Sequence, residues 1–309
     1  MKLPIFNTEI DTPVAKGIGL MLLGCGLLTA NDALMKALVE NLPVGQVIGL
    51  RGVFALSVVL LLAPWVGGFS KLRANKVSGV VLCSGLLLFN IVVFPLCLPY
   101  MAFADAIILA YTSPIWVVAL APLLIKERAR WQQWIAVVIG FGGACLVIKP
   151  AAGAVHWAVL IPLVVAFVVG LRDIVTRKIA ASESALAIVA YTNVFSIIVG
   201  LLSIFLGWKA LTGMQFAQLG MAGLFFSVAQ ILMVEAFRLV EATVLSTFKY
   251  SSILFAAVFG FLFWGEVLDF LALAGATLII ISGLVIVRYR HKPMPTIADV
   301  MPRAVRSPD

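Results

Sequence analysis

Tyr111-Thr112-Ser113-Pro114 opens an apolar run that ends at Lys126-Glu127-Arg128, and a second apolar run containing glycines follows. An offset of 139 residues gives the same order again: Tyr250-Ser251-Ser252-Ile253 opens an apolar run that ends at Gly265-Glu266, and another glycine-containing run follows. Few residues are identical between the two copies, and apolar runs match each other easily by chance. The polar break, the lone glutamate and the glycine nevertheless fall in the same order. We therefore interpret the chain as two repeats of one unit.

The composition is that of a membrane protein. Of the 309 residues, 63% are hydrophobic and 12% are charged, and the mean hydropathy is +1.13. A water-exposed surface needs roughly twice that charged fraction. Apolar runs of about 20 residues recur with short polar interruptions, which indicates several transmembrane helices. The net charge of +8 lies mostly between these runs, so we expect contact with the lipid bilayer and none with nucleic acid.

The apolar runs predict an all-α membrane protein with ten transmembrane helices, five in each repeat. We expect a cytoplasmic segment at 1–15, the first repeat at 16–149, a linker at 150–156, the second repeat at 157–290 and a disordered cytoplasmic tail at 291–309. No cleavage site follows the first apolar run, which argues against a removable signal peptide. The predicted helices are 16–38, 45–65, 76–98, 103–124, 130–149, 157–179, 185–207, 214–238, 243–264 and 267–288.

The loops predict how the chain is oriented in the membrane. Lys71, Lys126 and Arg177 lie in loops on one side, each with further basic residues beside it, whereas the opposite loops hold few. By the positive-inside rule both termini are cytoplasmic. Because five is an odd number of helices, the second repeat must enter the membrane inverted. Inverted repeats are typical of secondary transporters, in which the substrate binds near the midplane between the halves.

The starts of the two repeats also match, since an offset of 141 residues pairs Asp32 with Asp173 and Lys36 with Arg177. With two five-helix repeats that each end in a glutamate turn and a glycine-containing helix, the chain resembles the drug/metabolite transporter superfamily, specifically its EamA-type members. Lys126 departs from this pattern, because a glycine often precedes the first glutamate.

Within that superfamily the chain is similar to bacterial amino-acid exporters of the YddG type. The stretch from Arg172 to Arg177 also looks like carriers of S-adenosylmethionine or riboflavin. The resemblance implies a multi-pass protein of the bacterial inner membrane with a small-molecule substrate. It further implies a cavity lined by the first, third, fourth, sixth, eighth and ninth helices.

The sequence contains no pattern that indicates an enzyme, a cofactor or a metal site. The two histidines, His156 and His291, are far apart, and all four cysteines fall inside apolar runs, where we interpret them as core residues. No P-loop occurs, so this chain alone does not use ATP. We expect a substrate or ion gradient to drive transport.

Polar residues inside a span are costly and are therefore the first candidates for a substrate site. Lys249, about seven residues into the ninth helix, is placed to receive a substrate carboxylate, and Tyr250 offers a stacking face or a hydroxyl. Alternatively, Lys249 extends to the cytoplasmic edge or pairs with Glu235 or Glu241. We interpret Arg51, in the second helix, as a side chain that extends to the membrane edge.

Amides and aromatic residues complete the predicted substrate site. Asn90 and Gln230 fall at nearly equivalent points of the two repeats, and they either line a hydrated cavity or join neighbouring helices. Tyr100 and Tyr111 flank the outer mouth or belong to the interfacial aromatic belt, and Trp116 forms an apolar wall or packs in the core. The predicted substrate-binding residues are Lys249, Tyr250, Asn90, Gln230, Tyr111, Trp116, Tyr100 and Asn31.

Two acid–base pairs at i, i+4 are candidate gates. The Asp32–Lys36 pair would close the outer mouth and the Asp173–Arg177 pair the cytoplasmic one; alternatively, each pair neutralises charge near a helix end. Glu127 and Glu266 are interpreted as residues that order turns. The predicted gating or coupling residues are Asp32, Lys36, Arg172, Asp173, Arg177 and Glu235, and Asp32 and Glu235 are also candidate proton carriers.

Small residues recur along the last helix of each repeat. Ala136, Gly140 and Ala144 are spaced by four in the fifth helix, and Gly275 and Gly283 lie in the tenth. Such faces allow close helix contact, and they either pack the two halves together or mediate a homodimer.

The sequence thus predicts a secondary transporter that moves small metabolites by alternating access. Amino acids, including aromatic or apolar ones, are the expected substrates, carried by export or facilitated diffusion. The alternative is uptake of S-adenosylmethionine or another bulky metabolite, for which a cationic sulfonium would favour an exposed acid over Lys249.

Overall fold

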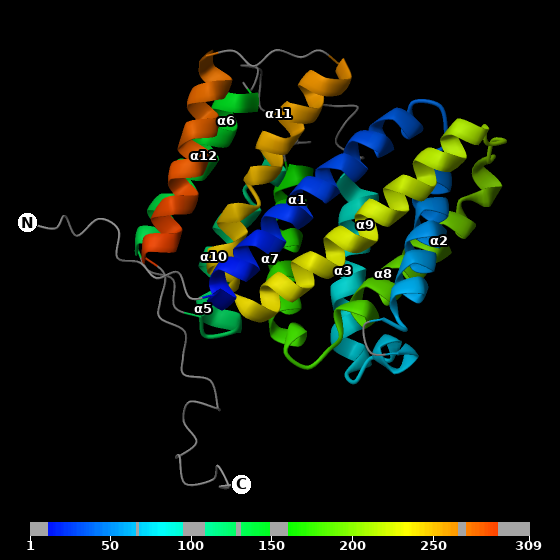
Figure 1. Ribbon diagram of the computed structural model, residues 1–309, viewed down its shortest axis with the longest axis horizontal. Helices are drawn as coiled ribbons and strands as arrows, with labels where there is room; N and C mark the ends of the chain where they lie inside the picture. Colours follow the sequence, from blue (N-terminus) through cyan, green and yellow to red (C-terminus); the bar gives the residue numbers. More distant parts are fainter. Residues whose placement is uncertain are drawn as a thin grey trace, which may run out of the picture.

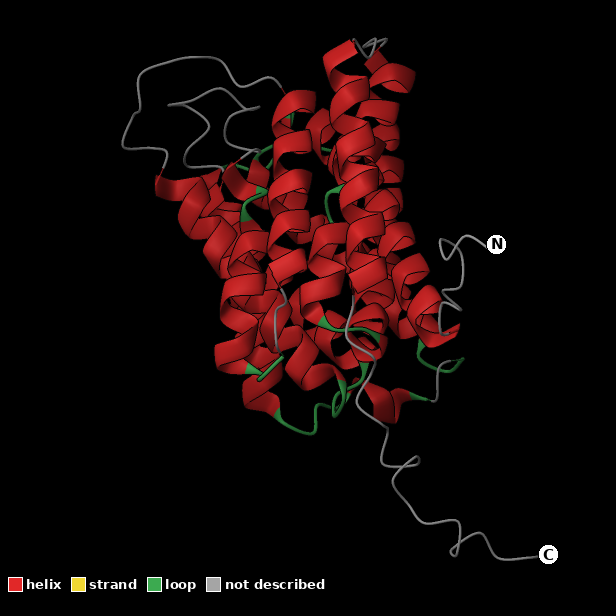
Figure 2. Ribbon diagram, turned by 90° about the vertical axis from the view of Figure 1, so that its left-hand side faces the viewer, coloured by secondary structure: helices red, strands yellow, loops and turns green. Residues whose placement is uncertain are grey.

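The computed structural model describes residues 12–65, 68–94, 109–127, 131–148, 160–264 and 270–289. In these residues the regular secondary structure consists of helices joined by short loops (Figure 2). This confirms the all-α prediction, and each of the ten predicted spans contains a helix. Tyr100, Glu266, the linker, residues 1–11 and the C-terminal tail lie outside the described residues. Residues 12–15, predicted to precede the first helix, belong to α1. The helices are α1 (Thr12–Val39), α2 (Val44–Leu62), η1 (Phe69–Leu72), α3 (Val77–Val93), α5 (Ser113–Leu124), α6 (Trp131–Ile148), α7 (Leu160–Ala180), α8 (Ala185–Leu202), η4 (Ile204–Leu206), α9 (Gly213–Leu239), α10 (Ala242–Phe248), α11 (Ser251–Trp264) and α12 (Phe270–Tyr289).

Length and composition suit several of these helices to a bilayer. Within the described residues, four helices are long and apolar enough to cross a membrane: Pro13–Val39, Val44–Leu62, Ala185–Leu202 and Gly213–Leu239. A span needs about 20 residues at 1.5 Å per residue. Of the shorter apolar helices, Val77–Val93 packs beside Ala185–Leu202, and Ser113–Leu124 packs mainly against Leu160–Ala180.

Apolar side chains cover much of the outer surface, while several charged side chains are buried inside. Leu61, Leu123 and Phe205 are 73%, 77% and 92% exposed, whereas Arg51 and Asp173 are only 5% and 1% exposed. In water this distribution would be unfavourable, because large exposed apolar patches drive association. Against lipid tails it is the expected one, since only the polar groups then need to be shielded.

The helices pack both in antiparallel pairs, such as α2–α8 and α6–α12, and in parallel pairs, such as α3–α8 (Figure 1). α1 lies against α9, α2 against α8 and α9, α3 against α7 and α8, α5 against α7, and α6 against α12. The α2–α8 crossing is made by small residues: a Cβ built on Gly49 would lie 2.7 Å from the Cα of Gly200, and one built on Gly45 would overlap the side chain of Ser203. These two backbones are therefore in direct contact, which any larger side chain would prevent.

The small faces of α6 and α12 pack against each other. A Cβ on Gly143 would lie 2.7 Å from the carbonyl oxygen of Gly275, and the Ser282 hydroxyl donates a hydrogen bond to the Ala136 carbonyl at 2.6 Å. Of the two alternatives that the sequence left open, the structure shows contact between the two predicted repeats. A homodimer through the same glycines would have to compete with this contact.

The ninth predicted helix is interrupted, so the prediction of one continuous helix over 243–264 is wrong. α10 ends at Phe248 and α11 begins at Ser251, and Lys249 and Tyr250 form a turn between them. Hydrogen bonds of the i→i−3 type tighten this turn, from Tyr250 N to Thr247 O at 3.2 Å and from Ser252 N to Lys249 O at 3.0 Å. No proline imposes the break, which is why the apolar pattern did not reveal it.

The first repeat has a turn at the equivalent place. Tyr111 and Thr112 form it, and α5 starts at Ser113 with Pro114 in its first turn, where a missing N–H is tolerated. The predicted helix over 103–124 is therefore divided here. Both interruptions coincide with the repeated Tyr-Thr/Ser-Ser motif, so the motif that revealed the repeat also marks a bend in each half.

The α2–α8 contact yields a test of the fold. Replacing Gly49 by Ala should force the two helices apart, at a cost of about 1–3 kcal/mol, and should lower the melting temperature in detergent by about 2–10 °C. Gly19→Ala is the matched control, because a Cβ there meets nothing within 4 Å and alanine favours the helix. Equal melting temperatures for the two variants would contradict the close crossing.

Candidate functional site

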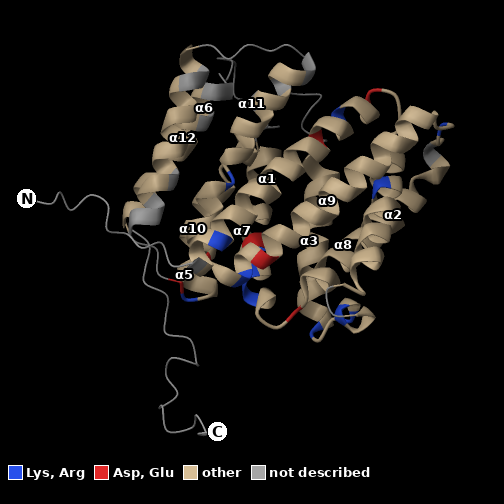
Figure 3. Cartoon of the chain, in the orientation of Figure 1, with Lys and Arg blue, Asp and Glu red and all other residues tan. Residues whose placement is uncertain are grey.

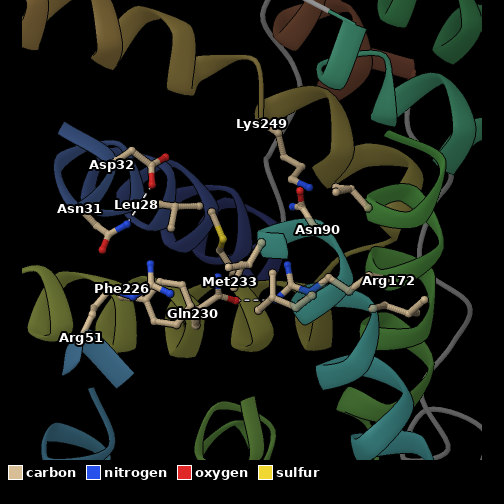
Figure 4. A pocket seen from close by; sticks show the side chains of 14 residues that line it. Leu28, Asn31, Asp32, Arg51, Asn90, Arg172, Phe226, Gln230, Met233 and Lys249 are labelled. Atoms are coloured by element: carbon tan, nitrogen blue, oxygen red, sulfur yellow. Dashed lines mark hydrogen bonds between the residues drawn. The ribbon is translucent and has the colours of Figure 1, made fainter. Parts of the chain in front are cut away.

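A cavity of about 220 Å³ lies where α1, α2, α3, α7, α9 and the α10–α11 turn converge. Its wall combines acidic, basic and amide groups with aliphatic side chains (Figure 4). It is lined by Leu28, Asn31, Asp32, Arg51, Leu86, Leu87, Asn90, Ile91, Val169, Arg172, Phe226, Gln230, Met233 and Lys249. These residues come from both predicted repeats.

Lys249 is held in a buried ion pair. Its Nζ donates to Oδ2 of Asp173 at 2.5 Å, and the two side chains are 16% and 1% exposed. The Arg172 guanidinium approaches the other carboxylate oxygen of Asp173 at 3.8 Å. Neither of the acids proposed from the sequence, Glu235 and Glu241, provides this contact. The interruption of the ninth helix places Lys249 at the cavity wall, where Asp173 neutralises its charge.

Arg172 and Gln230 connect α7 to α9 across the cavity. The Arg172 Nη2 donates to the Gln230 Oε1 at 2.5 Å, which Figure 4 shows as a dashed line. Gln230 therefore both lines the cavity and joins two helices, so both of the alternatives posed for it are true. Asn90, on α3, also lines the cavity, which is one of the two alternatives posed for it.

A second polar group lies on α1 and α2. The Asn31 amide donates to Oδ1 of Asp32 at 2.9 Å, and Asp32 is exposed on the cavity side. Arg51 does not extend to the membrane edge, as the sequence was interpreted; it is buried, and its guanidinium carbon lies 4.1 Å from the centre of the Phe226 ring. Within the described residues, its Nε and Nη2 have no hydrogen-bond partner. A lone arginine in the middle of an apolar helix was the sequence signal for this residue.

The three predicted aromatic residues that the structure describes lie outside this cavity. Tyr250 is completely buried and packs where a Cβ on Gly140 of α6 would be, and its ring centre is 6.4 Å from that of Tyr111. Trp116 packs edge-on against Phe167 with ring centres 5.4 Å apart. None of these three aromatic residues is therefore placed to contact a substrate inside the cavity.

Arg177 and Glu127 form a separate network at the end of α5, away from the cavity residues. Glu127 accepts hydrogen bonds from the Arg177 Nε at 2.9 Å and from the backbone N–H of Ala242 at 3.0 Å. Arg177 also donates to the Phe237 carbonyl at 2.6 Å. The predicted Asp173–Arg177 pairing is therefore replaced by two longer-range pairs, Asp173 with Lys249 and Glu127 with Arg177. Glu127 thereby connects the end of α5 to α7 and to the start of α10.

Arg238 extends this network at the end of α9. It pairs with Glu235 at 2.8 Å, and its other nitrogens donate to the carbonyls of Ala180 and Glu183, each at 2.6 Å. The Glu183 carboxylate accepts from the backbone N–H groups of Asn75 and Lys76, just before α3. Figure 3 shows acidic and basic residues side by side near the ends of α7 and α9. Glu235, a predicted coupling residue, thus lies in this network and not at the cavity.

Lys36 was predicted to be a gating residue but lies away from the cavity, whereas Glu183 was not predicted to have a role but belongs to the charged network. Lys36 lies one turn beyond Asp32 on α1, is exposed and does not line the cavity. Glu183 was not singled out in the sequence, because it follows α7 in a short loop and its partners are 107 and 108 residues away. Only the tertiary packing brings Glu183 close to these partners.

Comparison with known proteins gives a family match along the chain. The EamA-like transporter family matches residues 15–149 and again 156–288. The chain is 26% identical over 278 residues to the S-adenosylmethionine uptake transporter of Rickettsia felis, covering 90% of this chain and 94% of that protein. It is 27% identical over 285 residues to the pseudopaline exporter CntI of Pseudomonas aeruginosa, covering 88% and 96%.

A shorter match and a solved structure add to this comparison. A riboflavin transporter of Rhizobium johnstonii is 29% identical over 185 residues, covering 60% of this chain and 61% of that protein. A protein of known crystal structure superimposes with a TM-score of 0.76 at 16% identity and covers 87% of this chain and 95% of its own. At that identity the likeness concerns the fold alone. The family match confirms the resemblance to EamA-type transporters.

The buried ion pair makes a prediction about stability. Lys249→Met should leave the Asp173 charge buried without its main partner and cost about 3–5 kcal/mol. The double variant Lys249→Met/Asp173→Asn should recover most of this loss, because it removes both charges. Melting temperatures in detergent measure both effects, and Lys71→Met, at an exposed lysine, is the control. Strictly additive losses in the double variant would contradict the pairing.

Proposed function

The chain belongs to the EamA-like transporter family. From this membership we propose that it carries small zwitterionic metabolites by alternating access, and that amino acids are its main substrates. It is a multi-pass protein of the bacterial inner membrane, and its family transports small molecules. Export or facilitated diffusion is the proposed mode. The resemblance of the sequence to YddG-type exporters implies this mode.

The observation that carries this proposal is the presence of both an acidic and several basic groups on the cavity wall. Asp32 and Arg51 line one part of it, and Lys249 and Arg172 line another. A zwitterion presents both a cation and a carboxylate, so a wall with both charges can bind it without leaving a buried charge unpaired. Aliphatic residues such as Leu28 and Ile91 between the charges leave room for an apolar side chain.

The helix packing supports the inverted repeat that alternating access requires. If the repeats exchange by a two-fold rotation, α2 exchanges with α8 and α6 with α12. Each of these pairs is in direct contact and antiparallel: Gly45 faces Ser203 where Gly49 faces Gly200, and Ala136 bonds Ser282 where Gly143 faces Gly275. Partners related by an axis along the membrane normal would instead run parallel. An axis in the membrane plane is therefore proposed, with both termini cytoplasmic.

We assign the Glu127 network to closure of the cytoplasmic side. It lies at the end where α1 begins, since a Cβ on Gly17 would meet Val240, next to Arg238. Its links between α5, α7 and α10 must break for a cytoplasmic opening to form. Asp32 and Lys36, in the outer part of α1, are the proposed counterparts on the other side.

S-adenosylmethionine uptake is the second candidate function. It rests on Asp32, which is exposed in the cavity and so offers an acid to a sulfonium cation. Lys249 opposes this less than the sequence suggested, because Asp173 neutralises it. The Rickettsia felis relative is named for this substrate.

Transport in proteoliposomes tests the proposal. We expect saturable uptake of labelled L-phenylalanine and other amino acids, measured with and without an imposed pH gradient. Uptake that is unaffected by the gradient indicates facilitated diffusion, and acceleration by it indicates proton coupling. Uptake of S-adenosylmethionine alone favours the second candidate. Absence of flux for every compound of the panel contradicts both.

The closure assignment predicts the effect of Glu127→Gln. Loss of the charge should weaken the bonds to Arg177 and Ala242, and each kcal/mol lost raises the population open to the cytoplasm about five-fold. A single cysteine at Asn90, in a chain without its natural cysteines, should then react faster with an impermeant maleimide in inside-out vesicles. Glu40→Gln, at an exposed glutamate, is the matched control. An unchanged labelling rate would assign Glu127 to turn geometry only.

A further inference from the structure

The basic groups of the cavity differ in whether the protein satisfies them. Among the described lining residues these are Arg51, Arg172 and Lys249. Lys249 is paired with Asp173, and Arg172 donates to Gln230. Arg51 has two nitrogens, Nε and Nη2, with no hydrogen-bond partner in the described part of the chain. Arg51 is therefore the basic group whose binding capacity is least used by the protein itself.

The two unpartnered nitrogens lie on the same edge of the guanidinium. Nε–H and Nη2–H point in parallel, and this edge can hold both oxygens of one carboxylate. Arg51 is 5% exposed, so its unpaired N–H groups are costly unless they meet an acceptor. An arginine that only joined helices would direct these groups to carbonyls, as Arg177 and Arg238 do.

Packing holds Arg51 in one orientation. Its guanidinium rests on the Phe226 ring at 4.1 Å, and α9 approaches α2 so closely that a Cβ on Gly223 would lie 3.1 Å from the Arg51 carbonyl. Figure 4 shows Arg51 beside Phe226 and below Asn31, with Asp32 further along the same wall. Asp32 accepts from Asn31, and it accepts no hydrogen bond from the Nε or Nη2 of Arg51. The acid and the base are thus separate binding groups on one wall.

We propose that Arg51 binds the carboxylate of the substrate through Nε and Nη2, and that Asp32 receives its cationic group. This assignment rests on the proposed transport of zwitterionic metabolites. It moves the carboxylate contact from Lys249, where the sequence put it, to α2, a helix outside the set expected to line the cavity. The substrate class follows from the chemistry: compounds that carry a carboxylate and a nearby cation, including amino acids.

The experiment compares acids with matched compounds that lack the carboxylate charge. L-phenylalanine is paired with L-phenylalaninamide, and S-adenosylmethionine with its decarboxylated form, as competitors of labelled uptake in proteoliposomes. Arg51→Met should weaken competition by the acid about 10- to 100-fold, as expected for loss of a charged hydrogen-bonded contact, and change that of the amide less than about three-fold. Arg51→Lys keeps the positive charge but cannot bind both carboxylate oxygens with two parallel N–H groups, so it should weaken competition by the acid to an intermediate extent.

Two controls separate this role from others. Arg73→Met removes an exposed arginine and should leave both competitors unchanged. The double variant Lys249→Met/Asp173→Asn removes a second cavity cation together with its counter-charge and should keep the preference for the acid. Melting temperatures in detergent identify variants that fail to fold. If Arg51→Met fails to fold, the competition measured with Arg51→Lys tests the assignment instead.

The possible results divide clearly. Equal weakening of acid and amide in the Arg51 variants overturns the assignment and makes Arg51 structural. Loss of acid preference in the Lys249 double variant, with the preference kept in Arg51→Lys, overturns it in favour of Lys249. A wild-type protein that recognises none of the four compounds contradicts the proposed function itself, and this assignment with it. A selective loss of the acid in the Arg51 variants alone supports it.

Discussion

A charge buried in an apolar helix bundle needs a partner, and much of this structure follows from how that requirement is met. The ion pair of Lys249 with Asp173 joins the α10–α11 turn to α7, with side chains 16% and 1% exposed. In so apolar a setting an unpaired charge would cost several kcal/mol. The turn at Lys249 and Tyr250 puts the amine within reach of α7, so the interruption of the helix and the ion pair depend on each other.

Glycine contacts set the frame in which these charges meet. Gly49 against Gly200 and Gly143 against Gly275 bring pairs of backbones together. In lipid there is little hydrophobic drive between helices, so close packing supplies much of the association energy. The same contacts join the first predicted repeat to the second. Polar groups between the repeats can therefore be shielded from lipid without a soluble domain.

The helices could be predicted from the sequence because each apolar run must span a bilayer, whereas the partners of the charged residues could not. Asp173 and Arg177 are one turn apart, which favours a local pair, but Lys249 and Glu127 bind them from 76 and 50 residues away. Local spacing competes poorly with tertiary contacts inside a bundle. Tyr250 is a similar case: it follows Lys249 in the chain but faces Gly140 on α6. Arg51 was misjudged because snorkelling depends on depth and neighbours, which apolar periodicity does not report.

Hydrogen-bond saturation separates two kinds of polar cluster in this chain. Around Glu127, Arg177 and Arg238 the charged groups bond carboxylates, carbonyls and a backbone N–H. Such a cluster stabilises one arrangement of helices, and it resists change until several bonds break together. Around the cavity, Arg51, Arg172 and Asp173 each keep a buried polar atom without a hydrogen bond. Unused donors and acceptors at that depth are costly unless they meet a partner. This contrast agrees with the proposal that the first cluster closes the cytoplasmic side and that the second binds substrate.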